Sequence, residues 1–319
     1  MNIGNRRALF INYHNPGIFM ITMNKLPGLA DFSNIIHNPA ESEIRKAFRP
    51  DYHKLGFVIF YYLKDILPKK FPFLRIWQYV IMPDHIHFII QIKEKILLPL
   101  DAYIWQMRVD MTQTARKRNF IPADVKDIFE WGFNDQFLKT GRSLDRLFHY
   151  IAKNPYWYWQ RKKHPEFFKN IQEMMVCGVK CSLYGNLGLL DNPFKYPVIS
   201  HRADRLSGAI KRKMEEWDYA ISNGGVLVSP FIHDDEKTFM RKAFENDGKV
   251  ILISDTHFGP REKPYEALLE QCNKGNLLII SPDMEGALGL NYPFRQGCLY
   301  RNALAEKISD SLPLSALKS

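Results

Sequence analysis

The first half of the chain alternates short β-branched apolar runs with longer stretches in which apolar residues recur at helical spacing. Runs of the first kind predict strands, and apolar residues at i, i+3 and i+4 predict helices. The predicted elements are a strand over 17–23, a loop over 34–39, a helix over 41–67 ended by Pro68, and strands over 74–82 and 85–92. Pro83 and Asp84 are typical of a tight turn, so the last two strands should form a hairpin.

A second helix is expected over 100–118, followed by a strand over 128–133 and a third helix over 144–154. Gly141 and Ser143 precede the third helix and are typical of a helix start. The order of elements is therefore β-α-β-β-α-β-α.

The pattern changes near Pro165. A segment of aromatic and cationic residues over 156–163 is followed by a less patterned stretch that reaches about Lys180. Beyond it, short apolar runs alternate with helical stretches over 196–199, 206–220, 225–228, 236–244, 250–253, 265–271, 277–280 and 299–308. Such alternation predicts an α/β domain with a mostly parallel sheet covered by helices.

Length and composition agree with two globular domains. A chain of 319 residues exceeds the usual size of one small domain, and 46% hydrophobic residues are enough for sizeable cores. We therefore expect a first domain over 1–165, a linker over 166–180 and a second domain over 181–319.

The net charge of +10 and the pI near 9.3 favour a polyanionic partner, because cations placed on phosphates release condensed counterions. Charge alone does not establish nucleic-acid binding, since many basic proteins bind none. The charge supports nucleic-acid binding only if the sequence also contains a site suited to DNA chemistry.

The cysteines and the longest apolar runs exclude other classes of protein. Cys177, Cys181, Cys272 and Cys298 form no CxxC pairs, so neither a zinc site nor a disulfide framework is expected. Apolar runs are interrupted well short of the ~18 residues that a membrane span needs, and no signal peptide is evident at the N-terminus. These features predict a cytoplasmic protein with no membrane partner.

His85-Ile86-His87 is the first candidate for chemistry. Side chains alternate along a strand, so both histidines should share one face while Ile86 and Phe88 point into the core. Paired imidazoles at the end of a strand can bind a divalent metal. On its own, the pattern is better explained by a pair of surface or hydrogen-bonded histidines on a half-buried strand.

Tyr150 and Asn154 lie four residues apart on a predicted helix and should share a face. Pro155 disfavours helical geometry at Asn154, so we expect the helix to end or kink there and to leave the amide freer to reach a metal. Alone, this pair is better explained by a helix that ends in Asn-Pro, with Tyr150 packed at the edge of core residues.

Taken together, these motifs resemble the single-tyrosine HUH transposases, in particular the REP-associated tyrosine transposases. The resemblance covers about residues 15–165 and rests on three stretches in the family order: YVIMPDHIHFIIQI over 79–92, FND over 133–135 and YIAKNP over 150–155. It implies a ferredoxin-like or RRM-like α+β HUH domain, which agrees with the order of elements above.

The resemblance also implies roles for the residues. His85, His87 and Asn154 would hold Mg²⁺ or Mn²⁺, Tyr150 would be the nucleophile, and Asp135 would have a supporting role. The implied reaction on hairpin-bearing single-stranded DNA leaves a 5′-phosphotyrosine and a free 3′-hydroxyl. A tyrosine hydroxyl attacks poorly while protonated, so a cation on the phosphate would assist. A homodimer is also compatible with the sequence.

Other residues are candidates for contacts with DNA. The aromatic segment over 156–159 could stack on bases and the cations after it could bind phosphates, although an aromatic wedge between two domains explains it equally well. The candidates are Arg108, Lys153, Trp157, Arg161, Lys162, Arg202 and Arg295.

Residues from about 183 to 308 resemble the Rossmann-like domain of DNA-processing protein A, a single-strand DNA binder. The matching pieces include SHR over 200–202, GGVLVSP over 224–230 and GNLLIISP over 275–282. The glycines that approach a phosphate in that family are mostly replaced, and Ser229-Pro230-Phe231 stands before a helix. The stretch over 185–188 does not fit GxGxxG, so no dinucleotide cofactor is expected.

The leading hypothesis is a metal-dependent tyrosine transposase that cleaves and rejoins single-stranded DNA. The main alternative is a non-catalytic, domesticated single-stranded DNA-binding protein that retains the HUH fold. A nucleotide-binding Rossmann protein with an unrelated N-terminal extension fits less well, because the glycine fingerprint is absent.

Overall fold

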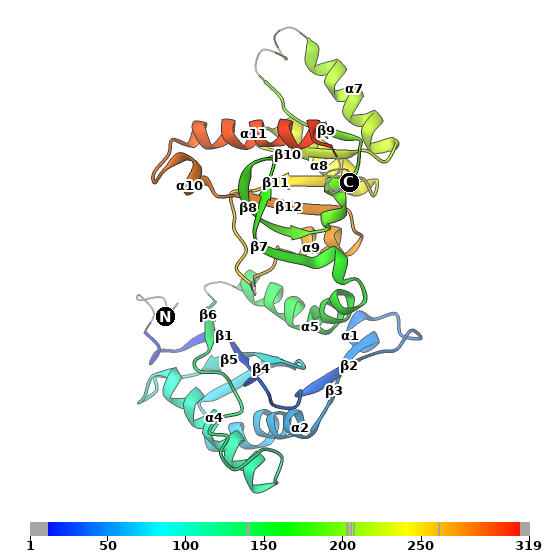
Figure 1. Cartoon of the computed structure of the whole chain (residues 1–319). Coiled ribbons are helices and arrows are strands. Elements are labelled where there is room, and N and C mark those ends of the chain that lie inside the picture. The colour runs from blue at the N-terminus through cyan, green and yellow to red at the C-terminus, as the bar shows by residue number, and fades with distance from the viewer. Residues whose placement is uncertain are drawn as a thin grey trace. The chain divides into compact units, whose positions relative to one another are not determined.

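The computed structural model (Figure 1) describes residues 12–138, 141–201, 204, 206, 208–260 and 262–312, without the side chains of 141–143. The chain divides into two compact units, Met1–Trp159 and Gln160–Ser319. Each unit carries its own sheet and core, so the protein is a mixed α and β structure. The domain limits expected from the sequence stay a prediction.

The first unit is built on an antiparallel sheet. In the described part of the chain its strands are β1 (Gly17–Asn24), β4 (Leu74–Ile81), β5 (His85–Ile92) and β6 (Asn134–Phe137), in the order β4-β5-β1-β6. Each neighbouring pair is antiparallel. The predicted first strand and the hairpin around Pro83 and Asp84 are confirmed.

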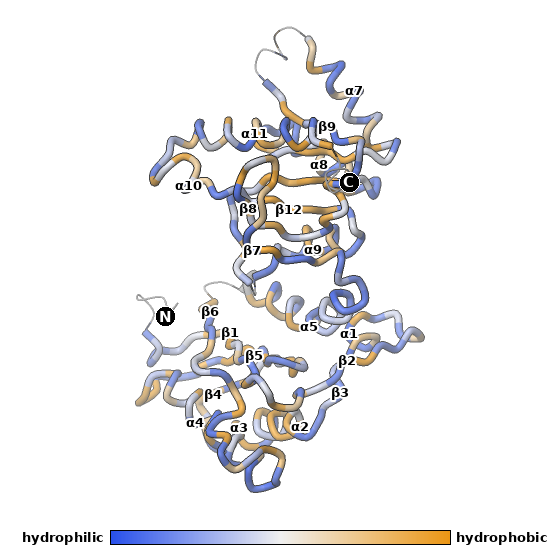
Figure 2. Tube along the Cα trace, viewed as in Figure 1, coloured by the Kyte–Doolittle hydropathy of each residue, from blue (hydrophilic) through white to orange (hydrophobic). Residues whose placement is uncertain are grey.

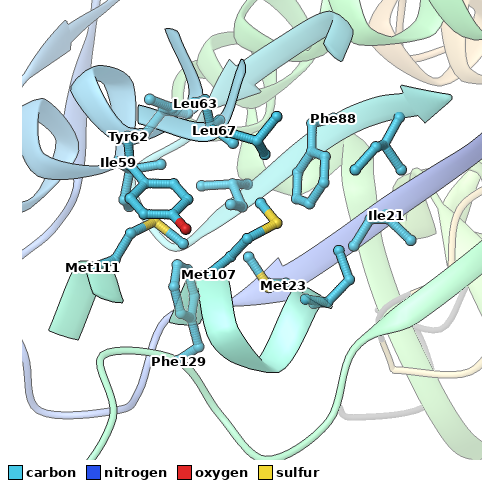
Figure 3. Packing of buried hydrophobic residues seen from close by; sticks show 14 of the residues in the cluster. Ile21, Met23, Ile59, Tyr62, Leu63, Leu67, Phe88, Met107, Met111 and Phe129 are labelled. Carbon is cyan, nitrogen blue, oxygen red and sulfur yellow. The ribbon is translucent and has the colours of Figure 1, made fainter. Parts of the chain in front are cut away.

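One face of this sheet carries the main core of the unit. It is covered by α2 (Lys54–Tyr61), the π-helical turn η1 (Tyr62–Ile66), α3 (Leu67–Lys70) and α4 (Leu100–Lys117). Figure 3 shows Ile21 and Phe88 of the sheet packed with Leu67 and Met107 of these helices. Alternation along β5 sends Ile86 and Phe88 into this core, as predicted.

The region before α2 differs from the prediction. Instead of a loop and a long helix, it forms the β-hairpin β2 (Ser33–His37) and β3 (Phe48–Tyr52), with α1 (Ile44–Ala47) between the strands. Pro50 explains part of the error, since it interrupts a helix but is tolerated in a two-stranded edge. Pro68 does not end the helix either, because it lies in the first turn of α3.

The last two elements of the first unit also differ from the prediction. The strand expected over 128–133 lies later, at β6, and only Phe129 of that stretch forms a bridge, to Lys25. The helix α5 (Gly141–Lys163) continues through Pro155 rather than ending there. Its apolar face, with Ile151, packs on the sheet face opposite the main core, and this packing outweighs the backbone bond that proline cannot make.

The second unit contains a mostly parallel six-stranded sheet. In the described residues its strands are β7 (Lys169–Val176), β8 (Val179–Gly185), β9 (Lys195–Pro197), β10 (Val226–Ser229), β11 (Lys249–Ile253) and β12 (Leu277–Pro282), in the order β7-β8-β12-β11-β10-β9. The strands β9 to β12 are parallel, whereas β7 and β8 are antiparallel additions. The expected linker over 166–180 therefore includes strand β7.

Helices cover this second sheet. They are α7 (Ala209–Ser222), α8 (Asp234–Glu245), α9 (Glu266–Asn273), α10 (Met284–Leu288) and α11 (Phe294–Asp310), with 3₁₀ turns η2 (Pro165–Phe168) and η3 (Leu187–Asp191). On one face, Leu304 and Ile308 of α11 pack on Ile251 and Leu278. Figure 2 shows the hydrophobic character of the central strands.

All four cysteines are free thiols. Burial raises the pKa of the Cys181 and Cys272 thiols to about 12, which makes both poor nucleophiles. In the described part of the chain, no helix combines the length and the apolar character that a membrane span requires.

Candidate functional site

The imidazoles of His85 and His87 lie side by side at the start of β5, with ring centroids 4.6 Å apart. His87 stands opposite Thr22 in the β1–β5 register, and the Thr22 Oγ1 is 2.8 Å from the His87 Nδ1. His85 Nδ1 is 2.7 Å from Asp84 Oδ1 in the preceding turn. Each ring is thus held through the same nitrogen by a neighbouring oxygen.

This arrangement is typical of metal-binding histidines, in which one ring nitrogen is fixed by an outer oxygen and the other faces the ion. With Nδ1 engaged in both rings, Nε2 is the nitrogen that would coordinate. Within the described residues, no three side chains of His, Cys, Asp or Glu gather into a metal site.

Tyr150 is brought to the same face of the sheet by α5. Its ring lies against His87, with centroids 5.5 Å apart, and its side chain is 37% exposed. The helix is fixed there because Ile151 packs with Met82 and Ile89, which share the face of the histidines. The predicted nucleophile is thus both anchored and accessible.

Asn154 lies one helical turn after Tyr150, as predicted, but in a different setting. Because α5 continues beyond Pro155, the expected freeing of its amide by a helix end is wrong. The side chain is 2% exposed, and its Nδ2 donates to the carbonyl of Tyr150 at 3.0 Å. This bond fixes the amide nitrogen and leaves Oδ1 as the acceptor end of the group.

Asp135 does not lie on the face of the histidines. It pairs with Ile21 across β1 and β6, and directly paired residues point to the same face, which here is the main core side. Its carboxylate accepts a hydrogen bond from the Tyr13 hydroxyl at 2.8 Å. Asn134, which pairs with Thr22, is the β6 residue on the histidine side.

Arg108 is wrongly predicted as a DNA contact. It is 1% exposed, and its guanidinium pairs with Asp127 at 2.8 Å. The same group donates to the carbonyls of Phe129, Glu130 and Gly132 at 3.3, 2.5 and 2.7 Å. Arg108 therefore fastens the segment that leads into β6 to helix α4.

Two residues of the aromatic segment pack inside the first unit. Trp159 lies against His37 and Phe48 of the β2–β3 hairpin, and Tyr156 lies against Phe48, with centroids 4.9 to 5.4 Å apart. Trp157 is only 4% exposed, so its expected role in base stacking is wrong. Tyr156 and Trp159 thus anchor the hairpin to α5.

The remaining candidates for DNA contacts are scattered. Lys162 is exposed, whereas Lys153 and Arg161 are partly buried, and all three lie on α5. Arg295 is exposed in the first turn of α11. Arg202 lies outside the described residues.

The loop before α8 has its own internal anion. The carboxylate of Glu236 is 1% exposed and accepts hydrogen bonds from the backbone N–H groups of Ser200, Ile232 and His233 at 2.8, 2.7 and 3.1 Å. A phosphate at a helix N-terminus would use donors of this kind. These backbone donors at the start of α8 are thus already taken by a side chain of the protein itself.

Comparisons with known proteins give partial likenesses. No protein-family model matches the chain. A relative from Haemophilus influenzae, described as an uncharacterised protein, is 28% identical over 109 residues, covering 28% of this chain and 58% of the relative. The match thus spans little more than half of that relative. A solved structure of a REP-associated tyrosine transposase bound to a REP hairpin is 15% identical, with a TM-score of 0.32 over 49% of this chain and 74% of the other.

Replacing Arg108 should destabilise the first unit. Arg108→Met keeps the aliphatic stem but leaves Asp127 and three carbonyls without their donor, so the free energy of unfolding should fall by about 3–5 kcal/mol. Lys117→Met, on the exposed end of the same helix, is the matched control. Urea denaturation measures the stability of both variants. Equal stability would show that Arg108 does not hold the segment before β6 on α4.

Replacing Glu236 should destabilise the second unit. Glu236→Ala leaves three backbone donors without an acceptor, and each buried donor so orphaned costs about 1–3 kcal/mol. Thermal unfolding should show the loss, while Glu245→Ala at the exposed end of α8 should unfold like the wild type. A Glu236→Ala protein as stable as Glu245→Ala would show that the loop does not depend on this carboxylate.

Proposed function

We propose that this protein cleaves and rejoins single-stranded DNA, with Tyr150 as the nucleophile and a divalent cation at His85 and His87. The observation that carries the proposal is the contact between the Tyr150 ring and His87, on the sheet face where the two imidazoles meet. The sequence motifs at these positions resemble those of HUH transposases, and the geometry supports the same assignment.

The topology of the first unit also supports an HUH-type fold. Without the β2–β3 hairpin, the elements run β-α-β-β-α-β, and the sheet has the order β4-β5-β1-β6. This is the order of a ferredoxin-like sheet, with the helices of the main core on one face. Here α5 covers part of the other face and places Tyr150 beside the histidines.

His85, His87 and Asn154 are the side chains that would hold Mg²⁺ or Mn²⁺. Two imidazoles fixed through Nδ1 and one amide with Oδ1 as its acceptor end form a suitable set of donors. When bound, the cation would stabilise the charge that develops on the phosphate during attack. Thr22 and Asp84 act as positioning residues, because each holds one imidazole.

Tyr150 would carry out the bond exchange. Its hydroxyl oxygen forms a bond to phosphorus while the bond from phosphorus to the 3′-oxygen breaks. The phenol loses its proton to solvent, and the departing 3′-oxygen takes up a proton from solvent to become a 3′-hydroxyl. The product is a 5′-phosphotyrosine, and attack by a 3′-hydroxyl reverses the step. No energy-carrying cofactor is consumed, because a phosphodiester is exchanged for another phosphodiester.

The proposed substrate is single-stranded DNA with a hairpin. This choice of substrate is supported by the resemblance to the transposases and by the net charge of +10. The alternative is a DNA-binding protein without catalysis. This alternative is motivated by Asn154, which is 2% exposed and whose amide donates to Tyr150 O, as a purely structural asparagine would also do.

Incubation with a hairpin-bearing oligonucleotide and Mn²⁺ should yield a protein–DNA adduct that survives denaturing electrophoresis. Tyr150→Phe should abolish the adduct, because it removes only the attacking oxygen. Tyr156→Phe is the matched control on the same helix and should retain it. Chelation of the metal, or His87→Ala, should lower the yield at least ~10-fold.

Three outcomes separate the hypotheses. An adduct that persists in Tyr150→Phe and disappears in Tyr156→Phe would contradict the choice of nucleophile. An adduct that is indifferent to chelation and to His87→Ala would contradict the metal site. Tight binding of every hairpin without any adduct would favour the non-catalytic alternative.

A further inference from the structure

Trp131 is the most exposed tryptophan among the described residues, with 84% of its surface accessible. Its ring lies on that of Trp105, with centroids 4.9 Å apart and planes inclined by 52°. The two rings together form an aromatic surface, and its burial against the flat face of a partner would be favourable.

The backbone on both sides of Trp131 is held by hydrogen bonds, although the Trp131 side chain is in solvent. Arg108 donates to the carbonyls of Glu130 and Gly132, the residues on either side of it. The guanidinium of Arg108, whose side chain is buried, also lies 4.5 Å from the centre of the Trp105 ring. One cation thus holds the backbone beside one tryptophan and lies over the ring of the other, so this backbone is already ordered before a partner binds.

The pair adjoins the candidate site through the end of β1. Glu130 N–H donates to the carbonyl of Asn24 at 2.9 Å, and Asn24 Nδ2 donates to Glu130 Oε2 at 3.2 Å. Asn24 is paired with His85 in the β1–β5 register. Trp131 is therefore the next residue after one that is bonded to Asn24, and Asn24 lies opposite the first histidine in the neighbouring strand.

We propose that Trp131 and Trp105 form a stacking platform for an unpaired nucleobase of the DNA strand whose phosphate is cleaved. This inference rests on the proposed function and adds a contact for the substrate. Every base presents a flat π-face, so a platform of this kind tolerates any sequence. The net charge of +10 favours a polyanion as the partner over an apolar protein surface or a second, equally basic copy of this chain.

The test uses the Tyr150→Phe protein, so that binding is measured without cleavage. Affinity for a single-stranded oligonucleotide is determined by fluorescence anisotropy, with an abasic site moved along the strand. One abasic position should weaken binding by about 5- to 150-fold, the range expected for the loss of one stacked base. Trp131→Ala should weaken binding by the same factor, and the abasic site should then cost nothing further.

Matched variants guard against a general surface effect. Trp131→Tyr keeps a stacking ring and should recover most of the affinity. Trp77→Ala removes another exposed tryptophan of the same unit, one that also carries a cation, Arg75, on its ring, and should bind like the parent. Because Trp131 is mostly in solvent, its variants should melt at the temperature of the parent.

The outcomes separate this inference from the proposed function. If the wild type forms the adduct but Trp131→Ala binds the intact oligonucleotide as the parent does, the platform is wrong and the proposed function stands. If Trp131→Ala loses affinity without any adduct from the wild type, the platform stands and catalysis fails. Additive losses from the abasic site and Trp131→Ala, equal losses in Trp77→Ala, or a change only in oligomeric state would each overturn the platform.

Discussion

The pleated register between β1 and β5 is the constraint on which the candidate site depends. Side chains of β5 alternate between two faces, so the same eight residues supply Ile86 and Phe88 to the core and His85 and His87 to the opposite face. A slip by one residue would bury both imidazoles among apolar side chains and expose the core. Thr22 pairs with His87 in this register, and its hydroxyl also contacts the imidazole. Formation of the β1–β5 pair therefore also positions the His87 ring.

Buried charges organise both units from within. Arg108 ties the segment before β6 to α4, and Glu236 closes the loop before α8. Both side chains are of types usually found at the surface, and both are compensated by backbone groups that would otherwise lack partners. Arg108, which the sequence suggests as a DNA contact, thus has a structural role, and backbone donors at the N-terminus of α8 are taken by the protein's own Glu236.

The parts predicted from sequence are those with strong local signals. The turn at Pro83 and Asp84, the helical spacing of α4 and the alternation across His85-Ile86-His87 each depend on neighbours in the chain, and the structure has them as expected. In the second unit, the alternating apolar runs predicted the parallel strands in order. Interactions between residues close in the sequence were sufficient to predict these elements.

The failures depend on tertiary contacts. The β2–β3 hairpin is held by Trp159 and Tyr156, more than a hundred residues later, and no local pattern reveals it. The helix α5 passes Pro155 because its apolar face is buried against the sheet. Trp131 was missed for a similar reason, since its exposure is set by the carbonyls that Arg108 holds. The role of Thr22 as a partner of His87 was also missed. The signal in the sequence was a single hydroxyl side chain within an otherwise apolar strand.

The most direct test of the account is whether the two histidines of β5 meet at one metal ion. Imidazole ¹H–¹⁵N spectra of the protein can be followed while Mn²⁺, which broadens nearby signals, is added in small amounts. Of the ten histidines, His85 and His87 should lose their signals first and together. The account would be contradicted if both signals stayed sharp while other histidines broadened.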